Sequence, residues 1–140
     1  MKLYFLLLCA MMILVFGGRA EAVNKTVCPK AGDVLDTSSQ RDKEALIQAL
    51  PHDVISKTYG KNPKFLEYEV EIVRPMNELT GTDKAYYHMA IQNCGIDVAN
   101  HSWFVRLRFP KVAAMGSSAV GEMFIVKDKT MHWRVWFQYR

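Results

Sequence analysis

The stretch Glu122–Arg140, EMFIVKDKTMHWRVWFQYR, predicts a β-hairpin. Its first part, EMFIVK, is a short run with apolar residues at both odd and even positions, and the following DKT is expected to form a tight turn. From Met131 onward the residues alternate, as expected of a strand whose successive side chains face opposite sides. Ser102–Pro110 alternates in the same way, so we expect the C-terminal third to be rich in β-strand.

The preceding part of the chain reads mainly as helix. Ser38 or Ser39 can cap a helix that ends near Pro51, and a second short apolar stripe ends at Gly60. Residues 66–72 then alternate between apolar side chains and glutamates, which predicts a half-buried strand. A third helix is expected over residues 82–94, with a strand as the rival interpretation of its central part.

The predicted order of elements is α-α-β-α-β-β-β. We therefore expect an α+β fold, a four-stranded antiparallel sheet with about three helices packed on one face. In general architecture this arrangement is similar to the cystatin-like and NTF2-like folds. That similarity concerns architecture alone and carries no function.

The N-terminus has the pattern of a cleaved signal peptide. Lys2 precedes an almost wholly apolar run over residues 3–16, and a small-x-small triplet ends at Ala22. We predict cleavage before Val23, which leaves residues 23–140 as a single secreted α+β domain that begins with a loop over residues 23–38. An uncleaved anchor is the alternative, but the apolar run is short for a membrane span.

Two cysteines, Cys28 and Cys94, remain once Cys9 is removed with the signal peptide. In an oxidising compartment they are expected to form a disulfide, which stabilises a fold by on the order of 4 kcal/mol for a loop of this length. A metal site involving Cys94 with His88 and His101 is the alternative. The spacing matches no zinc signature, so we expect neither a metal nor a cofactor.

Composition excludes some classes of function. The chain has 140 residues, is 50% hydrophobic and carries a net charge of +4, which falls to about +3 without Lys2, Arg19 and Glu21. This weak, dispersed charge argues against nucleic acid as a partner, and no membrane span is expected after signal removal. Asn24 and Asn100 begin N-x-[ST] triplets, which matter only if the source glycosylates.

No catalytic motif is present in the sequence, so an enzyme is not the favoured interpretation. The carboxylates of Glu67, Glu69 and Glu71 are best interpreted as a solvated strand face. We expect a small, secreted, non-catalytic binding or accessory domain. The alternative is a small hydrolase-like enzyme with a pocket built near three residues, His88, Asp97 and His101.

Side-chain alternation predicts one candidate binding surface. Successive residues of a strand face opposite sides of the sheet, so one set of alternate residues faces the helices and the other set points outward. We expect the outward set to be basic and aromatic and to consist of Phe104, Arg106, Arg108, Arg134 and Trp136. Trp and Arg are enriched at interfaces, so the expected ligand is a partner protein, a second copy of the chain or an anionic surface polymer. Alternatively, the glutamate strand neutralises the arginines, or loops cover this face.

Overall fold

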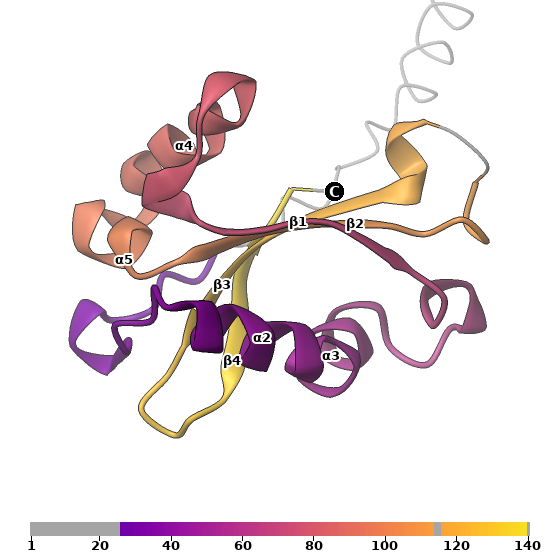
Figure 1. The fold of residues 1–140 in the computed structure, drawn as a ribbon, viewed down its shortest axis with the longest axis horizontal. Coiled ribbons are helices and arrows are strands. Elements are labelled where there is room, and N and C mark those ends of the chain that lie inside the picture. The colour runs from indigo at the N-terminus through magenta and orange to yellow at the C-terminus, as the bar shows by residue number, and fades with distance from the viewer. Residues whose placement is uncertain (1–25, 114–115, 140) are drawn as a thin grey trace, which may run out of the picture.

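A four-stranded antiparallel sheet, with strand order β1-β2-β3-β4, is the centre of the computed structural model, which describes residues 26–113 and 116–139 (Figure 1). The expected α+β class is confirmed. Every neighbouring pair is antiparallel, which leaves β1 and β4 at the two edges. The strands are β1 (Glu69–Pro75), β2 (Trp103–Arg108), β3 (Val120–Lys127) and β4 (Trp133–Gln138).

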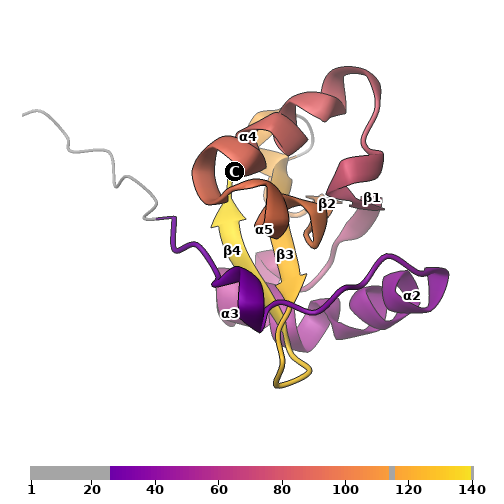
Figure 2. The ribbon, with the colours of Figure 1, turned by 90° about the vertical axis from the view of Figure 1, so that its left-hand side faces the viewer.

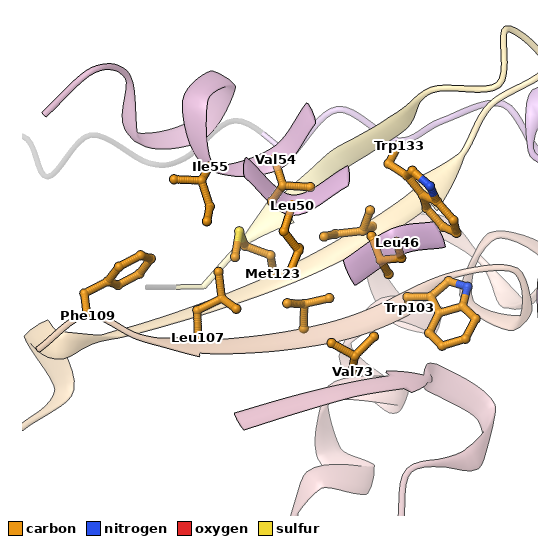
Figure 3. Packing of buried hydrophobic residues seen from close by; sticks show 12 residues of the cluster. Leu46, Leu50, Val54, Ile55, Val73, Trp103, Leu107, Phe109, Met123 and Trp133 are labelled. Carbon is orange, nitrogen blue, oxygen red and sulfur yellow. The ribbon is translucent and has the colours of Figure 1, made fainter. Parts of the chain in front are cut away.

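One side of the sheet, called the first face, is covered by three consecutive helical segments: α2 (Gln40–Ala49), the π-helical turn η2 (Leu50–Ile55) and α3 (Ser56–Tyr59). Of the two predicted caps, Ser38 or Ser39, the structure uses Ser39, which forms a reciprocal capping box with Asp42. Pro51 does not separate two helices, because the chain continues through η2. Figure 3 shows the buried side chains of this face, among them Leu46, Leu50, Val54, Trp103, Leu107 and Met123.

The opposite side, called the second face, is covered by α4 (Lys84–Cys94) and α5 (Ile96–Asn100), which Gly95 joins at φ 86° (Figure 2). Helices therefore lie on both faces, not on one as the sequence suggested. The physical reason is that β3 has apolar side chains on both faces of the sheet, so both faces have to be shielded from water. The buried residues here are Met76, Leu79, Ala90, Val98, Ala99, Phe104, Phe124, Val126 and Trp136.

Two β-bulges change which side chains share a face. In β1 the register shifts between Val70 and Ile72, and Ile72 packs against the second face while Val73 packs against the first. In β4 the register shifts so that Trp136 is the extra residue, and it packs together with Phe137 on the second face. Simple alternation predicts that Trp136 and Phe137 lie on opposite faces of the sheet. This prediction is wrong because a bulge interrupts the period of two.

The remaining described segments are short. Leu35 N–H donates to the Lys127 carbonyl at 2.9 Å, so the N-terminal segment extends the sheet beyond the start of β2.

The predicted signal peptide and its cleavage point at Ala22 and Val23 lie outside the described residues. Single helical turns connect the main elements: η1 (Ala31–Asp33), η3 (Pro63–Phe65), η4 (Met76–Glu78), η5 (Gly81–Asp83) and η6 (Ser117–Ala119).

Candidate functional site

The aromatic part of the predicted binding surface is buried. Phe104 is 0% exposed and stacks on Tyr86 of α4, with their ring centroids 4.5 Å apart. Trp136 is 6% exposed, and its indole N–H donates to Ser102 Oγ at 3.0 Å. The expectation that both rings face solvent is therefore wrong, because α4 and α5 cover the face that was expected to be open.

Arg106, the central cation of that predicted surface, belongs to a polar cluster at the end of the second face. Its guanidinium contacts Glu122 Oε1 at 2.8 Å and Asp83 Oδ1 at 2.9 Å, and the Tyr86 hydroxyl donates to Glu122 Oε2 at 2.7 Å. Burial lowers the pKa of Arg106, but the hydrogen bonds to Asp83, Glu122 and Tyr86 outweigh it, so the net effect raises that pKa. The cluster is internally satisfied.

The other two arginines also have acidic neighbours. Arg108 pairs with Glu71 of β1, which agrees with the alternative that the glutamate strand neutralises the arginines. Arg134 lies 3.6 Å from Asp128, and its side chain is 62% exposed. Of the five residues expected to form one surface, only Arg134 is therefore a strongly exposed charge.

The three residues of the enzyme hypothesis do not come together as a catalytic group. His101 Nδ1 lies 2.7 Å from the backbone carbonyl of Asp97, not from its carboxylate. His88 is exposed on α4, and Asp97 is exposed on α5. The hollows described below are lined by other residues.

Cys28 and Cys94 are joined by a disulfide bond. Cys28 Sγ and Cys94 Sγ are 1.99 Å apart, so the bond ties the N-terminal segment to the end of α4. Cys94 is therefore not a free thiolate next to His88 and His101. Among the residues that the structure describes, no group of three His, Cys, Asp or Glu side chains is placed to hold a metal ion.

An open groove follows the outer side of β4, and we call it the β4 groove. It consists of two adjoining hollows of about 300 and 250 Å³, which share Lys57, Thr58 and Val135. One wall comes from η2 and α3, with Asp53 at one end, and the other wall is β4 itself. Thr26 of the N-terminal segment borders the end near Gln138.

β4 forms one border of this groove. β4 is at the edge of the sheet, and within the described residues no further strand pairs with its outer side (Figure 2). An edge strand has a row of N–H and C=O groups that point away from its one neighbour. The groove therefore lies between an edge strand and a helical wall.

The more exposed charges at the β4 groove belong to two cations, each of which forms an ion pair. Lys57 is 59% exposed while its partner Asp53, 3.5 Å away, is 23% exposed. Arg134 is 62% exposed while Asp128 is 13% exposed. Both ion pairs are long, and in each pair the cation is the member that faces solvent.

The sequence analysis did not identify this groove. Alternation marked Arg134 and Trp136 as outward-facing, which is true of Arg134 alone. Lys57 and Thr58 belong to a helix about 75 residues upstream of β4, so their position beside that strand depends on the tertiary fold. Sequence periodicity, which is a local signal, has no means of detecting such a contact.

The chain matches no protein-family model, no curated protein and no solved structure. The similarity to cystatin-like or NTF2-like folds therefore stays an analogy of architecture. Across residues 26–113 and 116–139, every helix is too short or too polar to serve as a transmembrane segment.

Proposed function

We propose that this chain is a secreted, non-catalytic binding domain and that its partner binds in the β4 groove. The observation that carries the proposal is the groove itself, where an edge strand, a helical wall and two exposed cations meet. Burial of Phe104 and Trp136 removes the aromatic sheet face as a competing site.

Secretion is supported by the signal-peptide pattern over residues 1–22 and by the Cys28–Cys94 disulfide, since such bonds persist in oxidising compartments. We expect the exported protein to begin at Val23, to weigh two protons less than its reduced form and to contain no alkylatable thiol. Non-reducing mass spectrometry of freshly secreted protein measures all three. A retained residue 1–22 segment, or two free thiols, would contradict this part of the proposal.

The binding role is tested by reversing the exposed charges of the groove. The double variant Lys57→Glu/Arg134→Glu is incubated with the protein's native medium beside the wild type, and retained partners are identified by mass spectrometry. The matched control is Lys64→Glu/Lys84→Glu, which makes the same change in net charge at two exposed lysines outside the groove.

We expect one partner that the wild type and the control retain and that the groove variant loses, because opposite charge at an interface guides binding. Equal retention by all three proteins would show that the groove is not the site. Equal loss from both variants would show that only net charge matters.

A further inference from the structure

We propose that Asn100, the last residue of α5, carries an N-linked glycan in the exported protein. Asn100, His101 and Ser102 form an N-x-[ST] triplet, which is the acceptor pattern for this modification. The inference rests on the secretion part of the proposed function, because the sugar is transferred to chains that enter the export pathway. It combines three observations: the exposure of Asn100, the way its amide is held, and the burial of Ser102.

The position of Asn100 leaves room for a glycan. Asn100 is exposed and lies at the end of α5, which faces the viewer in Figure 2. The two preceding residues, Val98 and Ala99, are buried, so α5 is anchored on the second face through them and not through Asn100. The residues that line the β4 groove come from neither α4 nor α5. A glycan on α5 is therefore compatible with a partner in that groove.

The side-chain amide of Asn100 is held in a way that suits modification at its nitrogen. The Tyr87 hydroxyl of α4 donates to Asn100 Oδ1 at 2.6 Å. Within the part of the chain that the structure describes, Asn100 Nδ2 has no hydrogen-bond partner. An N-linked glycan is attached to Nδ2 and leaves the carbonyl oxygen as an acceptor. The bond from Tyr87 therefore persists in the glycosylated protein and orients the first sugar at the junction of α4 and α5.

The hydroxyl group of the triplet is used inside the folded protein. Ser102 is 1% exposed, and its Oγ donates to the Val98 carbonyl at 2.6 Å and accepts from Trp136 Nε1 at 3.0 Å. A transferase that recognises this hydroxyl has to reach it before Trp136 packs against it. We therefore place the transfer during export, before this segment folds, after which Asn100 stays at the surface with its glycan.

The reaction is a group transfer from a lipid-linked diphosphate oligosaccharide. Asn100 Nδ2 attacks C1 of the first sugar, so an N–C1 bond forms and the C1–O bond to the diphosphate breaks. The lipid diphosphate leaves with the electron pair of that bond, and the amide proton passes to a base of the transferase. The exchange needs neither an oxidant nor a reductant.

The experiment reads Asn100 in a peptide, because Asn24 begins a second triplet and the mass of the whole protein would not separate the two. The protein is purified from its native medium, reduced, alkylated and digested with trypsin, which releases residues 85–106. Peptide N-glycosidase A in heavy-oxygen water then converts a glycosylated asparagine into an aspartate that carries the heavy isotope. Asn93 lies in the same peptide outside any triplet and is the internal control.

We expect heavy oxygen at Asn100 in most molecules, none at Asn93, and none at either residue when the glycosidase is omitted. Two variants made in the same source cells sharpen the result. Asn100→Gln should lose the label, and Tyr87→Phe, which removes the hydrogen bond but keeps the triplet, should retain it. A purely structural role of Asn100 in joining α4 to α5 produces no label at all.

Exported protein that begins at Val23 and contains an unmodified Asn100 would overturn the inference and leave the proposed function intact. Label at Asn100 without the glycosidase would also overturn it, because the isotope would then come from spontaneous deamidation. Protein that keeps residues 1–22 and has no glycan at Asn100 would instead contradict the secretion on which the inference rests.

Discussion

The two faces of the sheet are both closed by helices, but different interactions hold those helices in place. On the first face the described contacts are mainly apolar, and a buried hydrogen bond runs from Trp103 Nε1 to Thr37 Oγ1 at 3.0 Å. On the second face an aromatic cluster lies beside the polar group of Arg106, Glu122 and Tyr86.

The difference shows why a basic and aromatic strand pattern need not be a binding surface. The aromatic residues of the second face are covered by α4 and α5, and Arg106 is neutralised by carboxylates from β3 and η5. The proposed binding site is instead the β4 groove. The predictions below test whether the two faces differ in the way described.

The largest effect is expected for Trp136→Ala on the second face. This variant removes ring contacts with Phe124, whose centroid is 5.3 Å away, and should destabilise the fold by about 3–5 kcal/mol. Arg134→Ala, two residues earlier and exposed, is the matched control and should change stability by less than about 1 kcal/mol. Urea unfolding measures both, and wild-type stability of Trp136→Ala would mean that this face is open.

The polar cluster of the second face is tested by Glu122→Ala. Glu122 is 3% exposed, and its loss leaves Arg106 with Asp83 as its one remaining carboxylate partner, so we expect a cost of about 2–4 kcal/mol. The comparison is Glu71→Ala, which breaks the more exposed pair with Arg108 and should cost less than about 1 kcal/mol. Equal costs in chemical denaturation would contradict the distinction between a buried cluster and a surface pair.

The packing of the first face is tested at the preceding residue of β3. A Cβ on Gly121 would lie 2.2 Å from the Tyr59 hydroxyl oxygen and 2.9 Å from Phe109 Cε2. Gly121→Ala should therefore destabilise by about 1–3 kcal/mol, as overpacked cores do. Adding Tyr59→Phe should recover part of the loss, because it removes the closest atom. A neutral Gly121→Ala in thermal unfolding would show that the first face is loosely packed at this end.

The turn between β3 and β4 is common to both faces and predicts a dependence on pH. The Thr130 hydroxyl, which donates to the Asp128 carboxylate, lowers the pKa of Asp128, and the backbone amides of His132 and Thr130 lower it further, against an opposing effect of burial. A lowered folded-state pKa stabilises the fold above the ordinary value of 3.8, and this contribution is lost as the pH falls through the folded-state value.

We therefore expect Asp128→Asn to be less stable than the wild type at neutral pH, with the difference shrinking in strong acid. Urea titrations across that range measure it. A difference that stays constant with pH would show that the carboxylate charge does not hold the turn.

The smallest effect is expected at Met131 in the same turn, which has a φ of 68° and a side chain that is 62% exposed. Met131→Gly should stabilise the protein by about 0.5–1 kcal/mol, because glycine adopts this conformation without steric cost. Met131→Ala is the control and should give no such gain. A lower melting temperature for the glycine variant would mean that the methionine side chain makes contacts that matter.

Much of the fold could be predicted from the sequence because its signals are local. Ser39 and Asp42 mark the start of α2, and Gly95 marks the end of α4. The α4 segment is helical, which decides against the rival strand. α5 was missed because five residues are too few to show a helical period.

The errors came from features that periodicity does not encode. The bulges at Glu71 and Trp136 shift the faces of the residues that follow them, and an alternation pattern contains no sign of either. The apolar residues at both odd and even positions of β3 did indicate that both faces of the sheet are buried. They were interpreted as an exposed patch because nothing in the local pattern says which helices cover it.

The most direct test of the account is photo-crosslinking from the β4 groove. Benzoylphenylalanine at Thr58, in the groove wall, is compared with the same group at Gln92, an exposed position on α4 over the second face. After irradiation in native medium, the account predicts a polypeptide adduct at Thr58 and none at Gln92. An adduct at Gln92 with none at Thr58 would contradict it, because binding would then occur at the outer surface of α4 and not at the β4 groove.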